Sequence, residues 1–220
     1  MIFFFLFLSL PLNADEYIFK FSAYTSNIKI GEVNDEISIE DSNFSIKRKL
    51  IPAGPLVLFL SNRKEITHGI SHDEKIFISK YFLKSKKKNM LATLDFEKKK
   101  YNIDNKEINF SANKSVLNIA TIQYRFLIEV IEFTENYNFQ FLKNDSIKNY
   151  SFKKIKSDSL TFKNNEYPVY IYERVSSDPK KRTRIWYSKN APRIPMKIIF
   201  SDKKRIYQFL LKSYIKITNE

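Results

Sequence analysis

The chain has 220 residues, of which 38 are Lys or Arg and 24 are Asp or Glu, so its formal net charge at pH 7 is +14. With no cysteine and only three glycines, the sequence excludes disulfide-stapled, Cys-ligated zinc, iron–sulfur and collagen-like proteins. A hydrophobic content of 43% excludes a disordered chain, and the length predicts a single packed domain.

The first 14 residues contain no charged side chain, and charge begins at Asp15. Their apolar run is too short to cross a membrane as a helix, and Ala14 supplies a small residue at the expected cleavage point. We therefore expect residues 1–14 to be a cleaved secretory signal peptide and residues 15–220 to form a single β-rich domain. The alternative is that the N-terminal run is a buried strand.

Apolar residues alternate with polar ones over most of the remaining chain, which is the period of half-buried antiparallel strands. The alternating sets are Tyr17, Phe19, Phe21 and Ala23; Ile37 and Ile39; Phe44 and Ile46; Met90, Ala92, Leu94 and Phe96; Tyr167, Val169 and Ile171; Met196, Ile198 and Phe200; and Tyr207, Phe209, Leu211, Ile215 and Ile217. Turn-forming residues separate them at 41–43, 71–73, 104–105, 164–165 and 177–179. The predicted fold class is mainly β (α+β), a large curved antiparallel sheet or open barrel.

One segment departs from this period. After a plausible helix cap at Ser115, the polar residues Asn118, Thr121, Arg125, Glu129 and Glu132 recur every three or four positions among apolar ones. We expect one long helix over residues 115–133, lying in the concave face of the sheet, with these five residues as its only solvent-exposed stripe. A shorter apolar run, residues 54–60, predicts a helical turn or a plug.

The sequence carries no recognisable catalytic motif. With glycines only at positions 31, 54 and 69, no dinucleotide fingerprint, phosphate loop or nucleophile elbow can be written. His68 and His72 lie in a segment that reads as strand and turn, where residues four apart are too distant to share one metal ion. We therefore expect a non-enzymatic protein with no cofactor and no metal.

The positive charge has two interpretations. Basic clusters at residues 84–88, 98–100, 180–182 and 203–205 are either a solvated surface or a contact for an anionic partner. Because Lys rather than Arg supplies most of this charge, we expect no nucleic acid partner. Peripheral contact with an anionic membrane surface stays open.

Several segments together resemble a known family. The residues that carry the resemblance are 17–21 with 28–32, the run 54–59 followed by Arg63, Glu65 and Gly69, the predicted helix, and 185–188 with 192–198. In this order they are similar to the exported bacterial family catalogued as domain of unknown function 3108. That resemblance covers residues 17–217 and implies a periplasmic location and a mainly β fold, but it supplies no activity.

A looser architectural similarity is to periplasmic lipoprotein carriers, whose open barrel holds helices and accepts acyl chains. It implies a periplasmic protein that binds an apolar ligand, such as a lipid or acyl chain, in a pocket near Phe59, Leu127, Trp186 and Met196, with Arg193 at its rim. The alternative is an envelope scaffold or protein-interaction domain with a filled core and an envelope protein as its partner. A cavity larger than roughly 300 Å³ beside the helix favours the carrier, and solid packing favours the scaffold.

Overall fold

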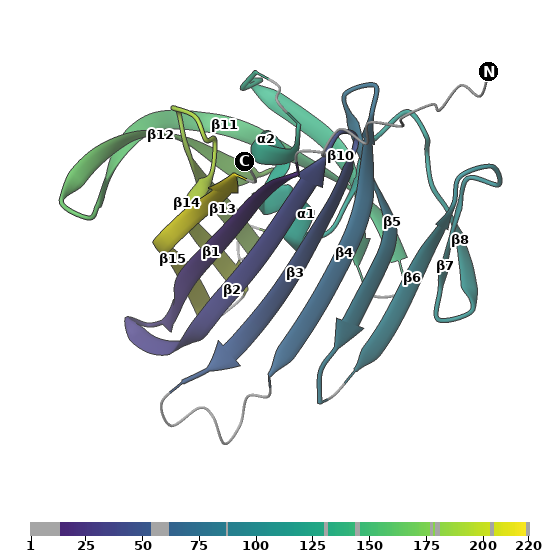
Figure 1. The fold of residues 1–220 in the computed structure, drawn as a ribbon, viewed down its shortest axis with the longest axis horizontal. Helices are drawn as coiled ribbons and strands as arrows, with labels where there is room; N and C mark the ends of the chain where they lie inside the picture. Colours follow the sequence, from purple (N-terminus) through teal and green to yellow (C-terminus); the bar gives the residue numbers. More distant parts are fainter. Residues whose placement is uncertain are drawn as a thin grey trace, which may run out of the picture.

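In the computed structural model of the protein, antiparallel strands wind around two short helices (Figure 1). The strands are β1 (Asp15–Thr25), β2 (Ile28–Glu40), β3 (Asn43–Pro52), β4 (Arg63–His72), β5 (Lys75–Lys84), β6 (Asn89–Asp95), β7 (Lys100–Ile103), β8 (Lys106–Asn109), β9 (Val116–Leu117), β10 (Asn136–Lys143), β11 (Ser146–Phe162), β12 (Asn165–Arg174), β13 (Lys181–Ser188), β14 (Pro195–Asp202) and β15 (Arg205–Thr218). The helices are α1 (Ile119–Gln123) and α2 (Arg125–Ile128). The structure describes residues 14–53, 62–86, 88–129, 132–143, 146–176, 178, 181–202 and 205–218.

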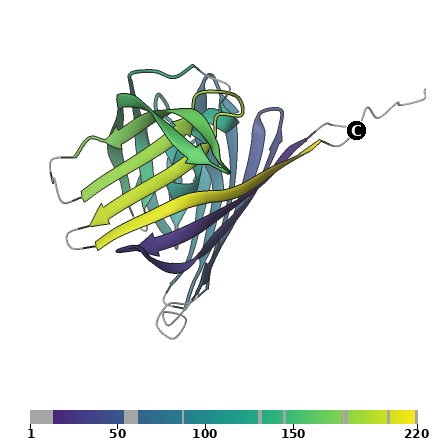
Figure 2. The ribbon, with the colours of Figure 1, turned by 90° about the vertical axis from the view of Figure 1, so that its left-hand side faces the viewer.

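The sheet closes on itself. β1 pairs with both β2 and β15, so the first and last strands lie side by side, as Figure 2 shows. At the other side, β4 pairs with β5, and the two-residue strand β9 bridges β5 to β10 in parallel fashion. Among the described residues, this makes a ring of twelve strands within the 15-stranded sheet. The mainly β class is confirmed, whereas the prediction of an open sheet or barrel is wrong because β9 closes the gap.

The meander β6–β7–β8 lies outside this ring. The first half of β5 pairs with β9, at Phe77, and its second half pairs with β6, from Lys80 to Lys84. The meander therefore branches away from the barrel wall. It covers a second apolar core, in which the Tyr101 hydroxyl donates to the Ile78 carbonyl at 2.6 Å.

The predicted strand faces are confirmed over most of the sheet. Tyr17, Phe19, Phe21 and Ala23 are all buried on the inner face of β1. Ile215 is an exception at 57% exposed, because a β-bulge between β1 and β15 skips Lys212 and reverses the alternation beyond it. Phe96 is 43% exposed because it lies one residue beyond the end of β6.

The single long helix predicted over residues 115–133 is wrong. Ser115 precedes β9, and Asn118 is the true N-cap, accepting bonds from the backbone N–H groups of Ala120 and Thr121. The helix breaks at Tyr124, where the backbone leaves helical geometry, and α2 ends after one turn at Glu129.

The predicted solvent-exposed stripe is also wrong, apart from Glu132. Asn118, Thr121, Arg125 and Glu129 are all buried, because a closed barrel surrounds the helical segment on every side. Their polar atoms bond to protein instead of water: Asn118 Nδ2 donates to Thr67 Oγ1 of β4 at 2.8 Å, and Arg125 Nε donates to Glu129.

Candidate ligand-binding cavity

The segment after α1 fills one part of the barrel with aromatic rings. Phe126 lies at the centre of this aromatic cluster, with ring centroids of Phe133, Tyr187, Tyr172 and Tyr137 at 4.6, 4.9, 5.4 and 5.9 Å. Edge-to-face and tilted contacts of this kind add to the free energy gained by burial. This part of the interior is tightly packed.

A buried ion pair fixes α1 against the wall. Asp35 on β2 and Arg48 on β3 face each other in the register, and Arg48 Nε and Nη2 donate to the two carboxylate oxygens at 2.8 and 2.6 Å. The same carboxylate accepts from the Tyr124 hydroxyl at 2.6 Å, and Arg48 also donates to Gln123 of α1. The Tyr187 hydroxyl bonds the Ile122 carbonyl at 2.6 Å from the opposite wall.

In this network Arg48 stays charged and Tyr124 stays protonated, as a purely structural role requires. Burial alone lowers the pKa of the Arg48 guanidinium, but the charge of Asp35 and its hydrogen bonds raise it above its usual value. Burial, and then the charge of Asp35, raise the pKa of Tyr124 well above 10.0, so its hydroxyl stays a donor. Sequence reasoning missed this pair. The available signal was two opposite charges at inward-facing positions of adjacent strands.

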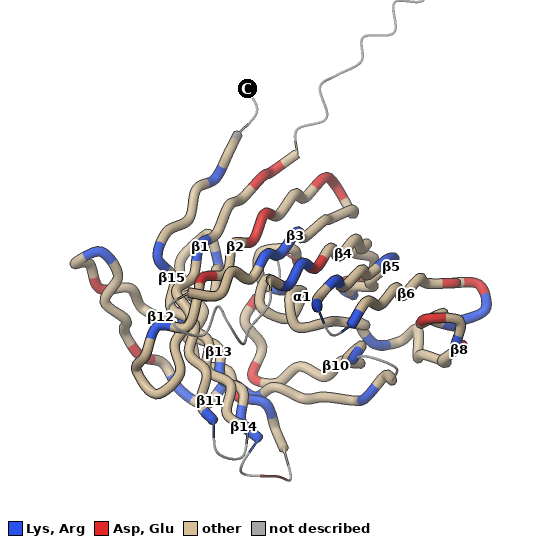
Figure 3. Tube along the Cα trace, turned by 90° about the horizontal axis from the view of Figure 1, so that it is seen from below, with Lys and Arg blue, Asp and Glu red and all other residues tan. Residues whose placement is uncertain are grey.

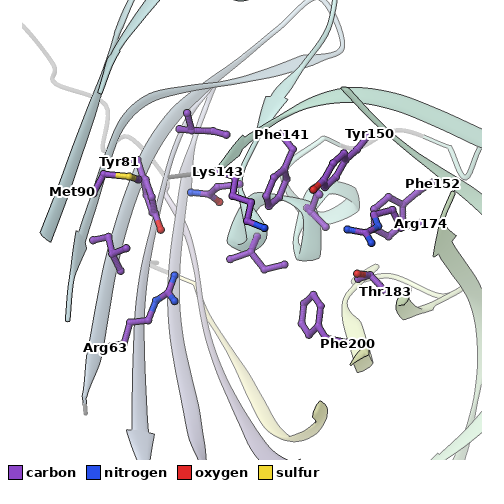
Figure 4. A pocket seen from close by; sticks show the side chains of 15 residues that line it. Arg63, Tyr81, Met90, Phe141, Lys143, Tyr150, Phe152, Arg174, Thr183 and Phe200 are labelled. Carbon is purple, nitrogen blue, oxygen red and sulfur yellow. The ribbon is translucent and has the colours of Figure 1, made fainter. Parts of the chain in front are cut away.

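Below α1 the barrel is hollow. A cavity of about 430 Å³, hereafter the lumen cavity, lies between α1 and the strand ends (Figure 4). Its lining comes from eight strands, α1 and the N-cap residue of α1: Arg63, Tyr81, Leu83, Met90, Asn118, Ile119, Ile122, Phe141, Leu142, Lys143, Tyr150, Phe152, Arg174, Thr183 and Phe200. A smaller hollow of about 140 Å³ shares Arg63, Ile119 and Phe200 with it and reaches Arg48. The wall is mainly apolar and aromatic.

Three cationic side chains, Arg63, Lys143 and Arg174, lie among these apolar residues. Arg63 is compensated, because its Nε lies 2.6 Å from Glu65 Oε1, and the Tyr81 hydroxyl donates to the other oxygen of that carboxylate at 3.0 Å. Burial, and then the charge of Glu65, raise the pKa of Tyr81, which keeps this donor protonated. Lys143 and Arg174 form no ion pair with a carboxylate in the described part of the chain.

Arg63 also links the lumen cavity to the outside. It lines a surface hollow of about 440 Å³ whose other lining residues are Lys49, Asn62, Lys64, Lys84, Ser85 and Lys86. Lys49, Lys64 and Lys84 lie directly opposite one another on β3, β4 and β5. Figure 3, seen from below, shows the basic segments of these neighbouring strands close together.

The residues predicted to line a pocket are not among those of the lumen cavity. Leu127 on α2 and Met196 on β14 are buried in the main core. Trp186 is also part of that core, at 7% exposed, although it lies on the opposite face of β13 from Ile185 and Tyr187, and Lys197 lies 5.0 Å from its ring centroid. Arg193 pairs with Glu132 at 3.0 Å.

Phe59 and the predicted turn or plug at 54–60 lie outside the described residues. Residues 1–13 of the predicted signal peptide lie outside them too.

The described part of the chain carries neither a metal site nor a helix that could cross a membrane. No group of three His, Asp or Glu side chains there is arranged to hold a metal ion, and His68 and His72 are both exposed on β4. No helix there has the length and apolar character needed to span a bilayer.

Together the ring of strands, the helical segment and the half-filled interior define a β-barrel with an internal cavity. The sequence matches the family described as "Protein of unknown function (DUF3108)" over residues 19–204, and the chain belongs to that family. The fold is similar to the crystal structure of a β-barrel-like protein of domain of unknown function DUF1849 from Brucella abortus, with a TM-score of 0.58 and 8% identity. That similarity covers 94% of this chain and 99% of the other. No curated protein matched the sequence.

Proposed function

We propose that the protein is a non-enzymatic binding protein of the bacterial periplasm whose barrel takes up an apolar ligand, such as a lipid or acyl chain. The observation that carries the proposal is the lumen cavity of about 430 Å³ beside α1. Ligand pockets span about 300–1,000 Å³ and are mainly apolar with a few placed polar groups, and the lumen cavity fits that description.

The alternative, an envelope scaffold with a filled core, is supported by the aromatic cluster around Phe126. The lumen cavity favours the binding protein, because interiors without a ligand normally pack to crystal-like density.

Native mass spectrometry of the full chain, purified without detergent, tests the proposal. We expect a fraction of the protein to carry an added mass of a lipid, and the lipid-free fraction to bind the apolar dye N-phenyl-1-naphthylamine saturably. Absence of both the adduct and saturable dye binding would favour the scaffold.

Export is part of the same proposal. It is supported by the start of β1 at Asp15, directly after the 14 residues that we expect to be removed. Intact mass of the protein recovered from the periplasm is expected to correspond to a chain beginning at Asp15. A protein that still begins with Met1 would contradict the periplasmic location.

Contact with an anionic membrane surface is supported by the row Lys49, Lys64 and Lys84 beside the cavity. Each basic residue near such a surface contributes about 1 kcal/mol. The protein is expected to co-float with phosphatidylglycerol vesicles at low salt and not with phosphatidylcholine vesicles. Equal binding to both vesicles would contradict an electrostatic contact.

A further inference from the structure

We propose that the ligand of the lumen cavity is an anionic amphiphile with a single chain, whose acid head group binds Lys143 and Arg174 while its chain lies against α1. The inference rests on the proposed function and adds to it the chemical class of the ligand and the residues that recognise it.

The position of Lys143 supports this placement. On β10, the residues Tyr137, Phe139 and Phe141 share the inward register, and Lys143 is the next residue of that row. The two aromatic residues deepest in the row are buried, Phe141 is half-buried, and Lys143 is exposed at the strand end. An apolar row that ends in a cation matches the profile of a molecule with an apolar chain and an anionic head.

Arg174 stands on the neighbouring wall. It lies opposite Phe152, which is 1% exposed, and its guanidinium lies 5.1 Å from the ring centroid of Tyr150. Its Nη2 donates to the Lys181 carbonyl at 2.6 Å, but its buried Nε has no acceptor in the described part of the chain. A buried donor without a partner costs free energy, which an anionic ligand would recover.

The charge of the cavity favours an anion. Among its described lining residues none is acidic, and the nearby Glu65 already forms an ion pair with Arg63. Lys143 and Arg174 therefore give the cavity a net positive charge next to low-dielectric walls, which strengthens their attraction for an anion. Figure 4 shows both side chains with their charged ends directed toward the middle of the lining residues.

The remaining lining residues suit a chain rather than a polar body. Ile119 and Ile122 of α1 form one side, and Met90 and Phe200 come from opposite walls. A volume of about 430 Å³ lies in the lower part of the usual range for ligand pockets, which favours one chain over two.

Titration calorimetry on the full, delipidated protein tests the inference with four probes: dodecanoate, dodecyl phosphate, dodecan-1-ol and inorganic phosphate. Both anionic amphiphiles are expected to bind saturably, and dodecan-1-ol at least about tenfold more weakly, because charged hydrogen bonds contribute more than 1.4 kcal/mol. A stronger preference for dodecanoate or for dodecyl phosphate identifies the head group as a carboxylate or a phosphate.

Lys143→Gln and Arg174→Gln are each expected to weaken dodecanoate binding about tenfold, and to change dodecan-1-ol binding by less than about twofold. Arg174→Lys keeps the charge and is expected to retain most of the preference for the acid. Lys80→Gln is the matched control, because Lys80 is an exposed lysine of β5 that does not line the cavity, and it should leave all affinities unchanged.

The inference is overturned if dodecan-1-ol binds as tightly as dodecanoate, or if neither glutamine variant changes the preference. Binding of inorganic phosphate as tight as that of dodecyl phosphate would also overturn it, in favour of a simple anion site. If none of the three chain-bearing probes binds, the proposed function itself fails, which is a different result.

Discussion

Asp35 and Arg48 form the contact on which the position of α1 depends. Their pair is buried, with side chains 0% and 9% exposed, and it reaches both Gln123 and Tyr124. Removing one partner leaves an uncompensated charge in the barrel interior, whereas replacing both by apolar groups does not.

Asp35→Ala is therefore expected to lower the free energy of unfolding by about 3–5 kcal/mol, and the double variant Asp35→Leu, Arg48→Met by much less. Urea unfolding followed by circular dichroism measures both. A double variant as unstable as the single one would mean that packing, and not the buried charge, sets the cost.

Glu129 is the residue whose titration matters for stability. It is buried beside Arg125, with its Oε1 unbonded in the described part of the chain, and burial raises its pKa to about 7 although the charge of Arg125 lowers it. In the unfolded chain the carboxyl group has its ordinary pKa of 4.5. Between these pH values the folded state binds more protons than the unfolded state, so stability falls as pH rises from about 4.5 to about 7.

Glu129→Gln removes this titration, so the stability of the variant relative to the wild type is expected to increase through that window and to level off above it. Thermal unfolding of both proteins at closely spaced pH values provides the measurement. A stability difference that does not vary with pH would contradict the raised pKa.

Three neighbouring strands carry a local conflict of charge. Lys64 of β4 lies between Lys49 of β3 and Lys84 of β5 in the register, and like charges directly opposite on adjacent strands destabilise a sheet. No carboxylate in the described part of the chain pairs with these three lysines. The row therefore carries a local cost to stability.

Lys64→Glu is expected to raise the free energy of unfolding by about 0.2–1 kcal/mol for each of the two new pairs at low salt, and less at 1 M salt. Lys64→Gln should give about half of this gain, because it removes repulsion without adding attraction. A loss of stability in Lys64→Glu would show that the repulsion is already screened.

The sequence predicts the faces of the strands better than the surroundings of the helices. The period of two predicted the inner face of β1 because strand alternation follows directly from backbone geometry. It failed at Ile215 because a bulge depends on the partner strand. In the helical segment, polar residues do recur every three or four positions, but their polarity does not mean that they are exposed. Asn118 and Arg125 form hydrogen bonds to other side chains inside the closed barrel.

The candidate site was harder to predict than the fold. The positions proposed from the sequence, such as Leu127 and Trp186, lie in the buried core and not on the wall of the lumen cavity, because no local pattern tells which part of a barrel is filled. Lys143 carried a readable signal, since it continues the inward row of Phe139 and Phe141. Arg174 carried a similar signal, since it follows Tyr170 and Tyr172 at period two on β12.

At the scale of the whole molecule, the helical segment divides a closed barrel into a packed part and a hollow part. The aromatic cluster around Phe126 fills the first, and the lumen cavity of about 430 Å³ occupies the second. A difference of this kind within one barrel is the structural basis of the proposed binding function.

The binding of N-phenyl-1-naphthylamine to the variant Thr183→Phe tests most directly whether the lumen cavity is a binding site. Thr183 is a buried residue of β13 on the cavity wall, so a phenylalanine ring there occupies the space that a ligand needs. Leu127→Ala is the control, because it empties space in the packed part and should cost about 2–5 kcal/mol of stability without blocking the cavity. The account predicts that Thr183→Phe folds but loses saturable dye binding while Leu127→Ala retains it, and unchanged dye binding by a folded Thr183→Phe would contradict it.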